Sequence, residues 1–194
     1  MFKAMLRKVI LGSAVAILTT GVAVANTAPY VGAGIGINTV TTNVKVDSEN
    51  LALGNFRGVP FNVFAGYGGV ISQNYYLAGE AFGTITNANL SADASLKTTW
   101  SYGAAIVPGL MLSDHTLAYV RAGILRTRFS KADETRDGAQ LGLGMQTSLT
   151  QAIDLRGEYD FVAYRKVNET IDGVNLRVTP RADQFNLSLV YKFE

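Results

Sequence analysis

The sequence contains no cysteine, and this absence excludes disulfide bridges and thiolate metal sites. Its single histidine, His115, has no convergent set of metal ligands in the sequence around it. Beyond residue 25 the chain also lacks an apolar run of the roughly 20 residues that a membrane-spanning helix needs. The best stretch, residues 103–112, is short and contains Pro108. A disulfide framework and a helical membrane domain are therefore both excluded.

The first 25 residues have the three parts of a secretory signal peptide. Three basic residues precede an apolar stretch at residues 9–18, and residues 23–25 read Ala-Val-Ala, a small-residue cleavage site. A retained membrane anchor is the alternative, but the apolar stretch is short for a span. We expect residues 1–25 to be removed and residues 26–194 to form one domain.

A strong charge of either sign is also missing. Loss of the three basic residues of the signal peptide changes the formal net charge from +2 to −1. A nearly neutral chain gives no electrostatic basis for binding nucleic acid, so we expect no nucleic-acid partner.

Alternating apolar and polar residues are the strongest signal that is present. In the last ten residues every second side chain is apolar, and the intervening positions are mostly polar or small. This period of two predicts a strand with one apolar face. The apolar positions are Phe185, Leu187, Leu189, Tyr191 and Phe193.

Eight such segments follow one another along the chain. Connections after the second, fourth and sixth are short, and those after the others are longer, at residues 39–58, 87–97, 130–138 and 165–181. Short turns at one end and long loops at the other are typical of bacterial outer-membrane barrels. The predicted strands span residues 30–38, 59–68, 75–86, 98–112, 116–129, 139–149, 153–164 and 182–193.

The second face of these strands is rich in glycine, with a few charges. Glycine is poor in ordinary strands but fits inside a narrow barrel, where eight strands leave room only for side chains. An arginine facing lipid at the midplane would cost about 2–4 kcal/mol, so Arg121 is expected to point inward. The pattern predicts an all-β, eight-stranded, antiparallel up-and-down transmembrane barrel. A soluble periplasmic barrel or sandwich is a weaker alternative.

Charged residues on the inner face suggest a cluster in the lumen. Glu80, Arg121 and Glu158 each lie about five residues into an outward-running strand, and Arg156 lies just below them. Unpaired charges there would be costly. We therefore expect a Glu–Arg–Glu cluster that closes the lumen; a proton or ion path is the alternative.

Aromatic residues near the strand ends predict two girdles at the membrane interfaces. Arg126 and Arg128 fall on the outer face near a strand end, and we expect them to contact lipopolysaccharide phosphates. A solvated surface of mixed charge is the alternative reading for these two arginines. The girdle residues are Tyr67, Tyr75, Tyr191 and Phe193 at the inner interface, and Phe61, Trp100, Tyr102 and Phe161 at the outer one.

The run Ser113-Asp114-His115 has the composition of a catalytic triad, but adjacent residues in a tight turn cannot converge as nucleophile, base and orienter. We therefore expect no catalytic residues, no metal and no cofactor.

The chain resembles the small eight-stranded outer-membrane barrels related to the OmpA transmembrane domain and the opacity-type surface antigens. Residues 30–34, 65–68, 119–123 and 155–159 carry the resemblance, together with the closing strand. The resemblance implies outer-membrane lipid and the barrel-assembly machinery as partners. Glu194 after Phe193 departs from the usual terminal aromatic residue, and Pro108 predicts a bulge or a strand end.

Two functions are consistent with this fold. The first is a structural surface protein with a closed lumen that contacts host surface molecules through four extracellular loops, both termini being periplasmic. The second is a small solute pore of low conductance. The narrow, glycine-rich lumen and its charges favour the first.

Overall fold

The structure is a computed structural model that describes residues 27–46, 49–88, 98–129, 134–165, 167–171 and 174–193. The predicted signal peptide, residues 1–25, and Glu194 lie outside these residues. The described segments consist of strands joined by turns, and none of them contains a helix that could cross a membrane.

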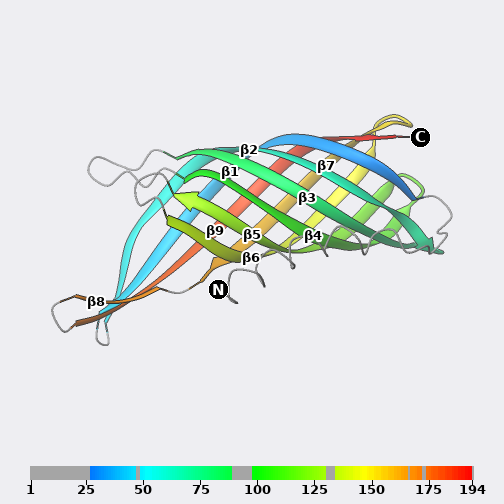
Figure 1. The fold of residues 1–194 in the computed structure, drawn as a ribbon. Helices are drawn as coiled ribbons and strands as arrows, with labels where there is room; N and C mark the ends of the chain where they lie inside the picture. Colours follow the sequence, from blue (N-terminus) through cyan, green and yellow to red (C-terminus); the bar gives the residue numbers. More distant parts are fainter. Residues whose placement is uncertain are drawn as a thin grey trace, which may run out of the picture.

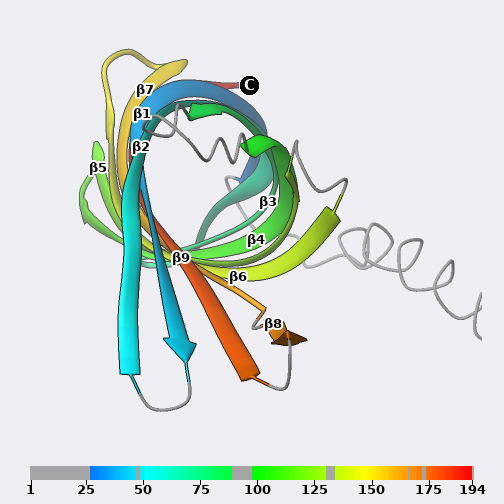
Figure 2. The same ribbon diagram turned by 90° about the vertical axis from the view of Figure 1, so that its left-hand side faces the viewer.

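Antiparallel pairing closes eight strands into a barrel, which confirms the predicted fold class. The sheet runs from β1 to β7 and then to β9, which pairs with β1 to complete the ring (Figure 2). A ninth strand, β8, pairs with β9 alone among the described strands. The strands are β1 (Thr27–Val46), β2 (Glu49–Ser72), β3 (Tyr75–Ala88), β4 (Thr98–Ser113), β5 (Thr116–Phe129), β6 (Glu134–Ser148), β7 (Ile153–Tyr164), β8 (Val167–Ile171) and β9 (Val174–Lys192).

Side chains alternate between the inside and the outside of the barrel, as the period of two requires. Leu187 is 49% exposed and Leu189 is 55% exposed, whereas Glu80 and Arg121 are 4% and 3% exposed. The barrel thus has an apolar outer wall and a polar interior, the reverse of a soluble protein.

The two ends of the barrel differ. At one end, here called the turn end, Gln73–Asn74 and Asp114–His115 form two-residue turns and residues 149–152 form the third turn. Gln73 has a φ of 43°, a left-handed conformation that such a tight turn requires. The last described residues also lie at this end, near the C-terminal label in Figure 1, where Phe193 N–H donates to Pro29 C=O at 3.0 Å.

At the opposite end, here called the extended end, several strands continue past the ring (Figure 1). β1 pairs with both β2 and β9 as far as Val46, and β8 pairs with the outer part of β9. The order β2–β1–β9–β8 therefore forms a four-stranded sheet, the outer sheet, which stands beyond the closed barrel.

The outer sheet shows that two of the predicted loops are mostly strand. Residues 39–58 and 165–181 were expected to be loops, yet β1 and β2 fill most of the first range and β8 and β9 most of the second. The expected loop 130–138 is likewise shortened, because β6 begins at Glu134. Pairing continues outside the barrel because each strand already has a neighbour in register, so few residues are needed to close each hairpin.

The expected bulge or strand end at Pro108 is wrong. β4 runs without interruption from Thr98 to Ser113, and Pro108 pairs with Leu77 of β3. On the β5 side the described pairing passes from Ile106 to Gly109 with no change of register. The missing N–H of proline is therefore accommodated by a local gap in the ladder on one side.

Candidate functional site

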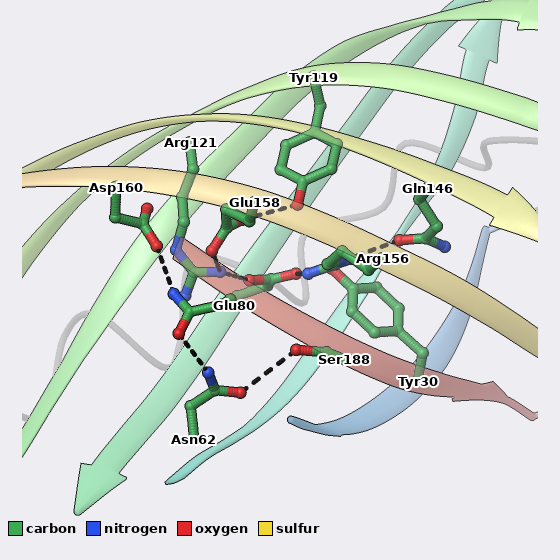
Figure 3. Close-up of polar contacts among 11 residues, drawn as sticks. Tyr30, Asn62, Glu80, Tyr119, Arg121, Gln146, Arg156, Glu158, Asp160 and Ser188 are labelled. Atoms are coloured by element: carbon green, nitrogen blue, oxygen red, sulfur yellow. Dashed lines mark hydrogen bonds and ion pairs between the residues drawn. The ribbon is translucent and has the colours of Figure 1, made fainter. Parts of the chain in front are cut away.

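The interior of the barrel holds a cluster of charged and aromatic side chains centred on Glu80 of β3 (Figure 3). Arg121 Nη1 on β5 donates to Glu80 Oε2 at 2.5 Å, and Arg156 Nη1 on β7 donates to Glu80 Oε1 at 2.5 Å. The Tyr30 hydroxyl on β1 donates to the same Oε1 at 2.7 Å. The carboxylate of Glu80 thus connects four strands of the barrel, β1, β3, β5 and β7.

A second carboxylate completes the balance of charge. Glu158 Oε2 accepts a hydrogen bond from the Tyr119 hydroxyl at 2.7 Å, and Glu158 Oε1 lies 3.5 Å from Arg121 Nη1. The structure therefore brings together all four residues of the predicted lumen cluster. Two buried arginines face two buried glutamates, which offsets the large cost of removing these charges from water.

Among the residues that the structure describes, Arg156 is the largest fully buried side chain, at 1% exposure. Its Nε donates to Gln146 Oε1 at 2.8 Å. The guanidinium also lies 4.6 Å from the centroid of the Phe64 ring and 5.2 Å from that of Tyr119, both within cation–π range. The Phe64 and Tyr119 rings and the Glu80 carboxylate thus surround the Arg156 guanidinium, which has no access to bulk water.

Glycines make room for these rings across the strand pairs. Tyr119 on β5 is paired with Gly144 on β6, and a Cβ atom built at Gly144 would collide with the tyrosine ring. Tyr30 and Gly66 are paired in the same way across β1 and β2. The sequence analysis had not assigned either tyrosine a role. A tyrosine paired with a glycine on the neighbouring strand is a signal for an inward-facing ring. This signal can be recognised only when the register between the two strands is known.

Polar contacts continue from the cluster toward the turn end. Gln146 Nε2 donates to Asp154 Oδ2 at 2.6 Å, and Lys192 Nζ lies 2.8 Å from Asp154 Oδ1. Lys192 is the most accessible member, with its side chain 35% exposed. The sequence analysis missed this layer because Lys192 and Asp154 belong to different strands whose register was unknown.

Toward the extended end the contacts are amide-rich. Asn186 Nδ2 donates to Asp160 Oδ2 at 3.0 Å, Asn62 Nδ2 donates to Asn186 Oδ1 at 2.9 Å, and Ser188 Oγ donates to Asn62 Oδ1 at 3.3 Å. These residues come from β2, β7 and β9, so they link β2 to β9 across the intervening β1 and extend to β7 (Figure 3).

A small cavity of about 20 Å³ remains beside this layer. Arg121, Gln140 and Asp160 are among its lining residues. Their buried atoms Arg121 Nε, Gln140 Oε1 and Asp160 Oδ1 have no hydrogen-bond partner in the part of the chain that the structure describes. A polar space of this size accommodates about one water molecule. It is far too small for a solute to occupy.

The predicted girdle residues are on the outward-facing positions of their strands. Tyr191 and Phe193 make an edge-to-face pair near the turn end, and the Tyr67 hydroxyl is hydrogen-bonded to Thr27 Oγ1 at 3.0 Å. Phe161 is half-buried on the same parity. The exposed members are Phe61, Tyr67, Tyr75, Trp100, Tyr102, Tyr191 and Phe193.

Arg126 and Arg128 are exposed on the outer wall near the extended end of β5. Arg126 is held in a two-point ion pair by Asp137 of β6, with Nε 2.7 Å from Oδ1 and Nη2 3.3 Å from Oδ2. The two arginines border an open recess together with Trp100 and Tyr102. They do not contact the interior cluster, because they belong to the opposite face of the strand.

His115 lies in the tight turn between β4 and β5, where its backbone N–H donates to Ser113 Oγ at 3.3 Å. Ser113, the last residue of β4, and His115 are thus two residues apart at one tight turn, not on opposite sides of a cleft. Within the described segments, no three histidine or acidic side chains gather in a way that could hold a metal ion.

An apolar outer wall around a polar interior with buried ion pairs is the arrangement of a transmembrane β-barrel. Residues 10–193 match the family model described as "Outer membrane protein beta-barrel domain". The chain therefore belongs to this outer-membrane barrel family, as the resemblance of its strands had predicted.

Several solved structures match this chain at low sequence identity. Neisserial surface protein A is 16% identical with a TM-score of 0.53, and the match covers 87% of this chain and 100% of the other. Ail, the attachment invasion locus protein of Yersinia pestis, is 17% identical with a TM-score of 0.42, covering 84% and 98%. The outer-membrane protease OmpT of Escherichia coli is 6% identical with a TM-score of 0.45, covering 89% and 100%. None of the curated proteins compared with the chain is a significant match.

Proposed function

We propose that this protein is a surface barrel of the outer membrane with a closed lumen and a structural role in the cell envelope. The observation that carries the proposal is the interior cluster around Glu80, which joins β1, β3, β5 and β7 through side-chain hydrogen bonds. A barrel of eight strands has little interior space, and charged and aromatic side chains occupy it here.

The arrangement of the cluster supports a plug better than a conducting path. Arg156 is fully buried between Glu80 and two aromatic rings, and arginine does not release its proton in proteins. The neighbouring cavity admits about one water molecule. A continuous file of water or ions would therefore require several of these contacts to break together.

Conductance in planar lipid bilayers tests the closed lumen. We expect the purified full-length protein to give no large, steady single-channel steps. The variant Glu80→Gln leaves Arg156 without its carboxylate partner, and we expect water entry and intermittent conductance from it. The lipid-facing variant Leu187→Val is the control and should remain silent. Large, steady steps from the unaltered protein would instead establish the alternative function, a solute pore.

We further propose that the extended end faces outward and that the turn end faces the periplasm. Short turns on the periplasmic side and longer outer connections are usual for bacterial barrels. The outer sheet then stands above the membrane, where its strand edges and hairpins are available for contacts with host surface molecules. Arg126 and Arg128 would lie near the outer leaflet, in reach of lipopolysaccharide phosphates.

No enzymatic role is proposed. The buried carboxylates of the described interior are engaged by arginine, tyrosine, lysine and amide groups, and His115 is in a turn at the opposite end from the proposed outer surface. During assembly, we propose that the strand ending at Lys192 and Phe193 is the segment that the barrel-assembly machinery reads.

A further inference from the structure

Asp160 is the buried carboxylate of the described interior that has no cationic partner. It lies on β7, is 1% exposed, and makes no ion pair with a described lysine or arginine. Glu80 and Glu158 pair with the two buried arginines. Asp154 pairs with Lys192. The described interior therefore holds four carboxylates against three cations, and a buried charge without a partner usually neutralises by binding a proton.

Hydrogen bonds give the two oxygens of Asp160 different roles. Oδ2 accepts from Asn186 Nδ2 at 3.0 Å, and Asn186 Oδ1 accepts from Asn62 Nδ2 at 2.9 Å (Figure 3). The amide of Asn186 thus presents its donor, and not its acceptor, to Asp160. Oδ1 is buried and has no hydrogen-bond partner within the described segments. A proton on this carboxyl therefore belongs on Oδ1, where it becomes a donor.

The small polar cavity beside Asp160 lacks such a donor. Gln140 of β6 also lines this cavity, and its buried Oε1 has no partner among the described residues. Among the described lining residues, Arg121 Nε is the unpartnered donor, so two acceptors share one donor. A single water molecule supplies donors but leaves the charge of Asp160 in place. A proton on Oδ1 supplies the second donor and removes the excess charge at the same time.

The charged groups around the cavity also favour the neutral acid. Glu158 lies two residues from Asp160 on the same face of β7, so it brings a second negative charge to the cavity. Arg121 of β5 is the cation of the lining, but its Nη1 already contacts Glu80 and Glu158. The described lining residues from β2, β3, β6 and β9 are uncharged and do not titrate.

We propose that Asp160 binds a proton in the folded barrel and stays neutral at neutral pH, which makes this site a pH-sensitive element of barrel stability. The proton comes from water, and the Oδ1–H group donates into the cavity that Gln140 lines. Glu158 stays ionised, because Arg121 and the Tyr119 hydroxyl both contact it. The proposal goes beyond the closed lumen and depends neither on it nor on the orientation of the barrel.

The pH dependence of stability follows from this site. In the unfolded chain the side chain of Asp160 is in water and releases its proton at acidic pH. Folding must therefore take up a proton at neutral pH, and this uptake becomes harder as the pH rises. While the folded barrel alone holds the proton, each pH unit changes the unfolding equilibrium roughly tenfold in favour of the unfolded chain. Above the pH at which the folded barrel also releases it, an unpaired charge remains in the interior.

Urea unfolding at about pH 6 and about pH 9 tests the site. Asp160→Asn keeps the shape of the side chain and carries a permanent N–H donor in place of the proposed O–H. We expect the midpoint urea concentration of the unaltered protein to fall between the two pH values, and that of Asp160→Asn to fall less. All other titrating groups are common to both proteins, so the difference between them isolates Asp160.

Two further variants are the controls. Asp114→Asn changes an exposed carboxylate in a turn and should keep the pH dependence of the unaltered protein. Glu158→Gln removes an ionised partner of Arg121 and should be destabilised at both pH values. If Asp160→Asn were destabilised equally at both pH values, Asp160 would be ionised in the barrel and the proposal would be overturned.

Infrared spectroscopy observes the proton directly in the folded protein. The carbonyl stretch of a protonated carboxyl group is separate from the bands of ionised carboxylates, and a detergent without carbonyl groups leaves this region clear. At neutral pH we expect such a band from the unaltered protein, and we expect it to be absent from Asp160→Asn and from the unaltered protein in alkaline solution. A band that persists in Asp160→Asn would place the proton elsewhere and refute the assignment.

Replacement of sodium by choline in the buffer separates a proton from a bound metal cation. A proton site predicts the same stability of the unaltered protein in both salts at constant pH. A loss of stability in choline that Asp160→Asn does not share would make a metal cation the occupant of the site, and the proposal would then be wrong.

Discussion

Gly144 and Tyr119 show how single residues build the interior. The tyrosine ring lies where a Cβ atom of residue 144 would be, and its hydroxyl donates to Glu158. Glycine weakens an ordinary strand, but Gly144 stabilises this barrel indirectly. Its missing side chain leaves space for the Tyr119 ring of β5, whose hydroxyl donates to the Glu158 carboxylate.

A pair of alanine substitutions tests this role. Gly144→Ala should lower the free energy of unfolding by about 1–3 kcal/mol, since the methyl group forces the Tyr119 ring to move. Gly157→Ala is the matched control, because no atom lies within 4 Å of a Cβ built there. Urea unfolding followed by Trp100 fluorescence would measure both. Equal effects from the two variants would contradict the account.

The coupling between Glu80 and Arg156 is a second prediction at this scale. Breaking a buried ion pair from one side typically costs about 3–5 kcal/mol, so Glu80→Gln should be strongly destabilising. In the double variant Glu80→Gln with Arg156→Gln no unpaired charge is left, and Arg121 retains Glu158. We expect the double variant to lose less stability than the sum of the two single variants. Additive losses in the same unfolding experiment would show that the two side chains act independently.

At the scale of whole elements, the closed ring and the outer sheet are distinct. β2 pairs with β3 only from Gly58 onward, whereas its pairing with β1 continues to Glu49. β9 likewise leaves β7 at Arg181 and continues beside β1 and β8. The outer sheet is therefore not required to close the barrel.

Shortening the β1–β2 hairpin tests this independence. Replacement of residues 43–52 by a two-residue Asn-Gly turn should leave the barrel folded, because the interior contacts all lie below this segment. Heat-modifiable migration on gels and circular dichroism would show the fold. If the outer sheet makes the proposed contacts, bacteria carrying this variant should adhere to host cells less than bacteria with the full hairpin. Loss of the folded band would show instead that the barrel needs its extensions.

At the scale of the whole molecule, the central property is the inversion of polarity between wall and interior. The wall exposes Ile, Leu, Val and aromatic side chains on every strand of the ring, while Glu80, Arg121, Arg156 and Glu158 are enclosed. In water this arrangement would be unstable, and in a bilayer it is the expected one. The difference between the turn end and the extended end then gives the molecule a direction across the membrane.

Cysteine labelling tests that direction cleanly, since the chain has no cysteine of its own. Arg165→Cys places an exposed thiol at the extended end, and Asp114→Cys places one in an exposed turn at the opposite end. On intact cells, we expect a membrane-impermeant maleimide to label the first variant alone. The second should be labelled only after the outer membrane is permeabilised. The reverse pattern would invert the proposed orientation.

The sequence by itself determined the barrel, its wall and the inward position of its charges. A period of two fixes which residues share a face, and a bilayer leaves only one energetically acceptable choice of face for Arg121, Glu80 and Glu158. The extent of the strands beyond the ring was only partly visible, although the six Val and Thr residues among residues 39–46 were a signal for it.

Only the tertiary structure decided which side chains meet. Tyr30 with Glu80, Lys192 with Asp154, and Trp100 beside Arg128 are contacts between different strands, so they depend on register and shear around the closed ring. Alternation along one strand contains no information on register between strands. Closure of the barrel sets all registers at once, and it thereby creates both the interior cluster and the recess on the wall.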